Sequence, residues 1–135
     1  MKHSPKLIAA ALLVAGGLGC GGEATSSEDQ PGTAVVSMTS GNAADGAVLI
    51  TVRGPGLSAP AAATSAYTVF SRLVGPDELN VIVLGASVAP GELFTVAVGA
   101  ANRPSAYSVR VEQVATQDDS LRSDLSPYQA SLASH

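Results

Sequence analysis

Few side chains in this sequence have the chemistry of a catalyst. Of the two histidines, His3 lies in a basic N-terminal segment and His135 is the last residue. A Ser-His-Asp arrangement needs a histidine that a scaffold holds in place, and the end of a chain is poorly held. The single cysteine, Cys20, lies between glycines with no base near it. Since no nucleophile elbow, phosphate-binding loop or zinc-protease motif occurs either, we expect no enzyme and no cofactor.

The most metal-like cluster lies in the segment TQDDSLRSDLS, residues 116–126. Its aspartates, Asp118, Asp119 and Asp124, offer the hard oxygen ligands that Ca²⁺ prefers. The segment lacks the ligand spacing, central glycine and terminal glutamate of an EF-hand, and Arg122 is expected to pair with one of these acids. A solvated polar loop is the favoured interpretation, with calcium as a weaker alternative and no zinc site, because zinc needs several Cys or His ligands.

The segment 102–107 is the most ligand-like loop. It combines the amide of Asn102, the guanidinium of Arg103 and the aromatic ring of Tyr107. These three are candidates for ligand binding. An ordinary connection, broken by Pro104, is the favoured interpretation.

A pair of acids of the glycosidase kind is a further alternative by residue type. The acids available for it, Asp77, Glu78 and Glu92, stand at predicted turns, where acids are common for local reasons. A carboxylate-dependent hydrolase, or an accessory domain of one, is therefore the weakest of the functions considered.

Charge is distributed unevenly along the chain. Both lysines, Lys2 and Lys6, precede every acidic residue, and the first acid is Glu23. Removal of residues 1–19 leaves five arginines against eleven acids, a net charge of 5 − 11 = −6, compared with −4 for the full chain. An acidic chain without lysine is not expected to bind nucleic acid or to dock electrostatically on anionic lipid.

The N-terminus has the pattern of an export signal. Lys2, His3 and Lys6 are followed by the apolar run LIAAALLVAGGL, residues 7–18. This length suits a secretory signal peptide and is too short for a membrane-spanning helix, which needs about 20 apolar residues.

This start resembles the signal peptide of bacterial lipoproteins, in which a small residue precedes the cysteine that becomes the new, acylated N-terminus. Here these residues are Gly19 and Cys20, and Gly17 stands where the motif usually has Leu. The resemblance implies a lipoprotein held on a bacterial membrane, facing the periplasm or the exterior, with secretion as the alternative. Residues 1–19 are then the signal peptide. Residues 20–32 form an acylated cysteine and a tether that we expect to be disordered, since it has no large apolar residue.

From residue 33 onward, short β-branched runs alternate with turn signals, which is typical of an all-β domain. Asp45-Gly46 favours a tight turn, residues 57–66 a loop, and APGE at 89–92 a type II turn with positive φ at Gly91. About seven strands are predicted, at residues 33–40, 47–54, 67–74, 79–85, 93–100, 107–115 and 128–134.

The inward face can be predicted for two of these segments. Val48, Ile50 and Val52 share one face, and in residues 107–115 Tyr107, Val109 and Val111 share another. The largest inward candidates are Phe70 and Phe94. We expect residues 33–135 to form one antiparallel β-sandwich of immunoglobulin-like or cohesin-like type, with a small barrel as the alternative.

A second resemblance supports this architecture. Residues 78–98, ELNVIVLGASVAPGELFTVAV, are similar to the late strands of bacterial cohesin-like modules. The similarity implies a sandwich and carries over no binding residue.

Together these observations predict a non-enzymatic, lipid-anchored envelope protein that binds another protein or has a structural role. A small secreted carbohydrate- or ligand-binding module is the main alternative, although three Tyr, two Phe and no Trp offer few aromatic platforms for a sugar.

Overall fold

The computed structural model describes residues 28–42 and 44–135, which form an all-β fold. The expected fold class is confirmed, with eight strands instead of seven. In the part of the chain that is described, the one helical segment is the 3₁₀ turn η1 (Pro104–Ala106), and no helix there is long and apolar enough to cross a membrane. The strands are β1 (Gly32–Thr39), β2 (Asp45–Arg53), β3 (Ser58–Ala62), β4 (Thr68–Gly75), β5 (Glu78–Val88), β6 (Gly91–Val98), β7 (Ser108–Ala115) and β8 (Gln129–Ser134).

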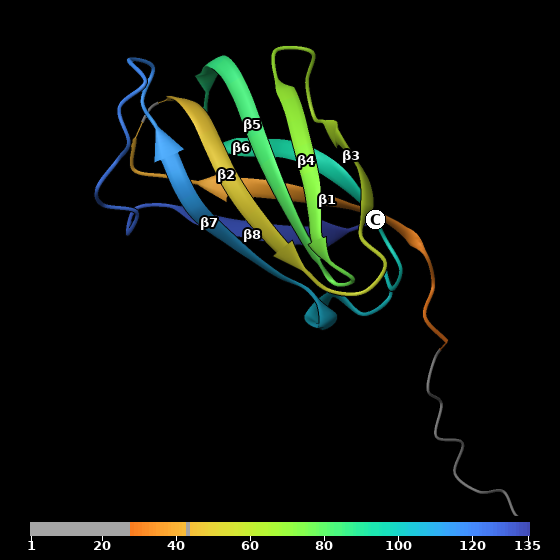
Figure 1. Ribbon diagram of the computed structural model, residues 1–135. Helices are drawn as coiled ribbons and strands as arrows, with labels where there is room; N and C mark the ends of the chain where they lie inside the picture. Colours follow the sequence, from red (N-terminus) through yellow and green to blue (C-terminus); the bar gives the residue numbers. More distant parts are fainter. Residues whose placement is uncertain (1–27, 43) are drawn as a thin grey trace, which may run out of the picture.

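The strands form two antiparallel sheets of four, stacked as a sandwich (Figure 1). One sheet has the order β3-β6-β1-β8 and the other β4-β5-β2-β7. The predicted hairpin of β4 and β5 is present, with Gly75 paired to Glu78 around a short turn. The two sheets stay separate, so the alternative of a small closed barrel is not formed.

The core lies between the sheets and follows the alternation of the strands. In β2 the side chains of Val48, Ile50 and Val52 are fully buried, as expected. In β7 Val109 and Val111 pack against the same core. Phe94 is fully buried and is the largest side chain at the centre. Phe70 was expected there too, but this prediction is wrong, because its side chain is 58% exposed on the outer face of β4.

Strand β3 is a correction to the predicted loop at residues 57–66. Alanine, proline and serine have weak strand preference, so this segment carried no signal. It pairs with β6 through Ala61↔Thr95 and Ala62↔Phe94 and shifts register between Ser58 and Ala61. Pro60 is tolerated because β3 is an edge strand, where a missing N–H leaves no ladder partner unsatisfied.

Two further local predictions are corrected. Asp45 and Gly46 open strand β2 instead of forming a tight turn, because Asp45 has buried partners elsewhere in the chain. The prediction of disorder up to residue 32 is wrong from Glu28 onward. Residues 28–30 form hydrogen bonds to the loop after β6, and Gly32 begins β1.

The sandwich has two distinct ends (Figure 1). The entry end comprises residues 28–32, 53–57 and 98–107, where the chain enters β1 and the N–H of Gly99 donates to the carbonyl of Pro55. The C-terminus lies there as well, since the N–H of His135 donates to the carbonyl of Thr33. The far end comprises residues 40–42, 44–45 and 115–128, including the long connection from β7 to β8.

Candidate functional site

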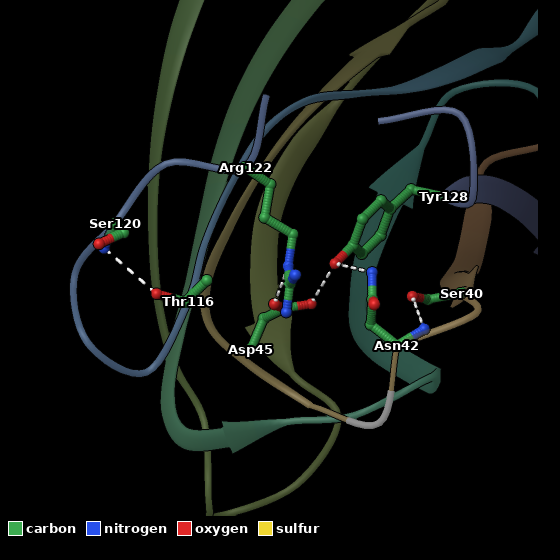
Figure 2. Close-up of polar contacts among 7 residues, drawn as sticks. All are labelled: Ser40, Asn42, Asp45, Thr116, Ser120, Arg122 and Tyr128. Atoms are coloured by element: carbon green, nitrogen blue, oxygen red, sulfur yellow. Dashed lines mark hydrogen bonds and ion pairs between the residues drawn. The ribbon is translucent and has the colours of Figure 1, made fainter. Parts of the chain in front are cut away.

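The most concentrated group of polar side chains surrounds a buried carboxylate at the far end (Figure 2). Asp45, the first residue of β2, is 0% exposed. Nε of Arg122 donates to its Oδ1 at 2.5 Å, and the hydroxyl of Tyr128 donates to its Oδ2 at 2.6 Å. A buried carboxylate is tolerated only when it is paired and hydrogen-bonded, and both oxygens of Asp45 satisfy this condition.

A second layer of contacts orients Tyr128. Nδ2 of Asn42 donates to its hydroxyl at 2.9 Å, and Oγ of Ser40 accepts from the N–H of Asn42. Burial raises the pKa of Tyr128, and the hydrogen bond to Asp45 raises it further. The pKa of Arg122 is also raised, because its hydrogen bond to Asp45 favours the charged guanidinium. The phenol is therefore held neutral between a carboxylate and an amide.

The network fastens the long connection between β7 and β8 onto β2. Within this connection the N–H of Thr116 donates to the carbonyl of Ser120, and the N–H of Ser120 donates to Oγ1 of Thr116 at 3.2 Å (Figure 2). The N–H of Arg122 donates to the carbonyl of Val114 and so brings the guanidinium over Asp45. A hollow of about 340 Å³ lies beside Arg122 and Asp124. Because the side chain of Asp45 is only 1% exposed, the arrangement acts as a fastening and does not present a carboxylate to a substrate.

The calcium candidates are not brought together. Asp124 accepts a hydrogen bond from the N–H of Ser126, which lowers the pKa of its carboxyl group. Asp118 and Asp119 are exposed, and Asp119 has a φ of 63°. Arg122 pairs with Asp45 and not with an acid of its own loop, so that expectation is wrong. Within residues 28–42 and 44–135, no three acidic, histidine or cysteine side chains form a group that could hold a metal ion.

The three ligand candidates in the loop after β6 hold other parts of the same chain. Asn102 accepts from the N–H of Gln30 at 2.9 Å, and its Nδ2 donates to the carbonyl of Glu28. Nη2 of Arg103 lies 2.6 Å from Oδ1 of Asp29. We call these contacts between residues 28–30 and 101–103 the entry clamp.

Tyr107, the third ligand candidate, fastens the entry end internally. Its hydroxyl donates to the carbonyl of Pro55 at 2.6 Å and accepts from the N–H of Ala100. Its ring also fills the space over Gly54, where a Cβ atom would clash with the ring. The structure therefore assigns Asn102, Arg103 and Tyr107 positions in internal contacts. Cys20, the candidate for lipidation, lies outside the described residues.

An uncovered apolar surface on β4 and β5 is the feature that the sequence did not indicate. Of the exposed large hydrophobic side chains in the described residues, four are on these two strands, and the fifth, Leu121, is on the far-end loop. Phe70, Ile82 and Leu49 form one cross-strand row on the outer face, since Ile82 pairs with both of the others. A shallow hollow of about 300 Å³ lies along this row. The β4–β5 surface comprises Leu49, Phe70, Arg72, Val74 and Ile82 on the outer face, together with the exposed Leu73 at the open edge of β4.

Comparison with known proteins identifies no relative of this chain: no family model, no curated protein and no solved structure matches it.

Proposed function

We propose that this chain is a non-enzymatic, lipid-anchored protein of the bacterial cell envelope whose sandwich binds another protein. The observation that carries the proposal is the uncovered β4–β5 surface. Phe70, Leu73 and Val74 are each more than half exposed, and Ile82 is 40% exposed. Large apolar side chains gathered in one region of the surface are typical of an interaction site, whereas single exposed ones are ordinary.

Strand β4 also offers a way of binding. It lies at the edge of its sheet, so one row of its backbone N–H and C=O groups has no strand beside it. A partner that adds a strand there would gain backbone hydrogen bonds and bury the same apolar side chains. A surface of this kind fits a protein better than a sugar, which would need aromatic platforms and several polar donors.

The surroundings of the acidic residues support a role without catalysis. Asp29, Asp45, Glu78 and Glu112 each pair with an arginine. The hydrogen bond from Arg110 lowers the pKa of Glu112. A general acid needs a raised pKa, so this pairing favours a structural role for Glu112.

The anchoring part of the proposal depends on Cys20, and the substitution Cys20→Ala tests it. Acylation at this position would hold the protein stably on a membrane, because two or more acyl chains bind far more firmly than one. We expect the wild-type chain to be in the membrane fraction and to be labelled by a fatty-acid probe. The variant should carry no label. An unlabelled wild-type chain would contradict the anchoring.

The binding part is tested on the surface itself with the double substitution Phe70→Ser and Ile82→Ser. The full chain is solubilised from envelopes after brief crosslinking, and the crosslinked species are compared. We expect the double variant to lose at least about 80% of the species formed by the wild type. The control is Leu121→Ser, because Leu121 is 67% exposed but lies at the far end. Equal losses in both variants would show that the β4–β5 surface is not the binding site.

A further inference from the structure

The four edge strands of the sandwich differ in how they are protected against pairing with another strand. Strand β3 has five residues and contains Pro60. Strand β7 carries the exposed ion pair of Arg110 and Glu112, and the far-end loop takes part of its edge through the bridge between Ala115 and Leu121. Short length, proline, charge and a covering loop are the usual means of blocking an edge. Strand β8 is also short, with six residues, and exposes Ser and Ala.

Strand β4 has almost none of these protections. It has eight residues and contains neither proline nor lysine. Among the described residues, no backbone hydrogen bond outside the sheets involves residues 68–75. Arg72 is the only charged residue in the whole segment from 57 to 74. Its neighbours Phe70, Leu73 and Val74 are exposed, so this edge is both open and apolar.

We infer that the occupant of this edge is a second copy of the same chain, paired antiparallel β4 to β4 around a two-fold axis at Ser71. The inference rests on the proposed function and names its partner. A two-fold interface must be self-complementary, because each residue meets its counterpart from the same strand. The sequence of β4 meets this condition in one register.

With Ser71 opposite Ser71, Phe70 of each copy lies opposite Arg72 of the other copy. The pair therefore occurs twice in the dimer. Both side chains are on the outer face beside Leu49 and Ile82, where a guanidinium can lie over an aromatic ring. On the inner face Val69, which packs against the core, lies opposite Leu73. This contact would cover Leu73, whose side chain the facing sheet leaves 55% exposed.

The neighbouring registers that also keep outer face beside outer face give less favourable residue pairs. An axis at Arg72 would place two arginines directly opposite each other, which is repulsive. An axis at Phe70 would place Leu73 opposite Tyr67, whose hydroxyl is already bonded to the N–H of Ala89, and would leave Val74 without a partner strand. The segment 63–67, which would lie near the Gly75 end of the second copy, carries no charge that could repel it.

The test is disulfide crosslinking with Ser71→Cys in the full chain, in intact envelopes treated with a mild copper oxidant. Opposite residues of an antiparallel pair have Cα atoms about 4.5–5.5 Å apart, within the range of a disulfide. We expect a species of twice the monomer mass that is lost on reduction. The matched control is Ser131→Cys, an exposed serine on β8, and the wild-type chain controls for Cys20; neither should form this species.

A second substitution checks the register. Leu73→Glu added to Ser71→Cys would place a carboxylate opposite Val69, and because Leu73 is exposed the variant should still fold. The crosslinked dimer should fall at least about tenfold, with the resistance of the monomer to protease unchanged. An undiminished dimer would overturn the proposed register.

The remaining outcomes separate this inference from the proposed function. If Ser71→Cys crosslinks to a different protein, the second copy is wrong as the occupant and protein binding at β4 stands. If no dimer forms while the chain remains folded, the second copy is overturned as the occupant. Protein binding at β4 is then decided by the crosslinking of the Phe70→Ser and Ile82→Ser double variant, because a disulfide to another protein needs a cysteine in that protein.

Discussion

At the scale of single residues, Asp45 is a carboxylate buried in the protein interior, where a charge without a partner would not be tolerated. Its carboxylate is buried, and its two oxygens are bonded to Arg122 and Tyr128, which are 77 and 83 positions away. Removing one partner of a buried ion pair leaves the other uncompensated. The network thus makes the far-end loop depend on a single side chain of β2.

We predict that Asp45→Ala lowers the free energy of unfolding by about 3 kcal/mol, at the lower end of the range for broken buried pairs because Arg122 keeps some access to solvent. The measurement is urea unfolding at pH 7. Asp118→Ala, an exposed acid of the same loop, should change stability by less than about 0.5 kcal/mol. A loss below about 1 kcal/mol for Asp45→Ala would show that the pair is not a fastening.

The raised pKa of Tyr128 predicts a loss of stability in alkali. In the folded protein the phenol resists ionisation because it is buried beside a carboxylate, whereas in the unfolded chain it ionises near pH 10. Its contribution is therefore complete below about pH 10 and is lost as the pH rises through the raised pKa of the folded state.

The comparison of Tyr128→Phe with the wild type measures this contribution. At pH 8 the variant should be less stable by about 1.5–3 kcal/mol, because a hydrogen bond to a charged group is lost. The difference should shrink between pH 10 and pH 12 in urea unfolding. A difference that stays constant over this interval would contradict the pKa shift.

The sequence could not reveal this network, and the reason is physical. An Asp-Gly pair after a small, polar segment is typical of a turn, and only a partner far away in the chain makes Asp45 a buried residue. Arg122 stands among acids in the sequence, so local pairing was the natural expectation. Its backbone bond to Val114 directs it elsewhere, and no local pattern encodes that bond.

At the scale of elements, the positions of most strands could be predicted because β-branched runs and turn residues determine them locally. The faces could be predicted only where apolar and polar residues alternate, as in β2 and β7. Strand β4 has apolar residues at adjacent positions, Val69-Phe70 and Leu73-Val74. Such pairs do not indicate which face is buried. The larger residue, Phe70, turned out to lie outside, and this reversal is what exposes the β4–β5 surface.

The entry clamp is a second element whose role can be measured. We predict that Asn102→Ala combined with Arg103→Ala frees residues 28–30 and leaves the sandwich folded. The N–H of Ala101, which donates to the carbonyl of Gln30 at 2.7 Å, should exchange its hydrogen at least about tenfold faster. Global stability should fall by less than about 1 kcal/mol, because the ion pair with Asp29 is half exposed.

The control for the clamp is Arg110→Ala, which removes an exposed ion pair of the same type from β7. It should leave the exchange of Ala101 unchanged. If the double variant also leaves that exchange unchanged, Asn102 and Arg103 do not hold the entering chain.

At the scale of the whole molecule, the proposed anchor at Cys20 would let the clamp limit how far the sandwich can lie from a membrane. If Cys20 is the anchor, eight Cα–Cα steps separate it from Glu28, and they allow at most about 29 Å between the two residues. The eight residues of β1 extend over about 26 Å. The entry end would then lie within about 30 Å of the membrane surface, and a copy turned upside down would need a tether stretched almost to its full length.

Pairing through β4 restricts the orientation further. Antiparallel β4 strands point the entry ends of the two copies in opposite directions along the strands. Both tethers can be equally relaxed on one membrane only if the two-fold axis is normal to it, because both copies then lie at the same height. The axis of an antiparallel strand pair is perpendicular to the sheet, so the sandwiches must lie flat. The tether leaves from β1, so the sheet β3-β6-β1-β8 faces the membrane.

We therefore predict different distances from the membrane for labels on the two outer faces. Fluorophores are attached to Ser131→Cys on β8 and to Gln113→Cys on β7, and both positions are exposed. A quencher on lipid headgroups should reduce the fluorescence at residue 131 at least about twofold more than at residue 113. As a control for an upright monomer, labels at Ser105 of the entry end and Ser123 of the far end should be quenched about equally. Stronger quenching at residue 105 than at residue 123, with residues 113 and 131 alike, would show a sandwich that stands upright and would contradict the paired arrangement.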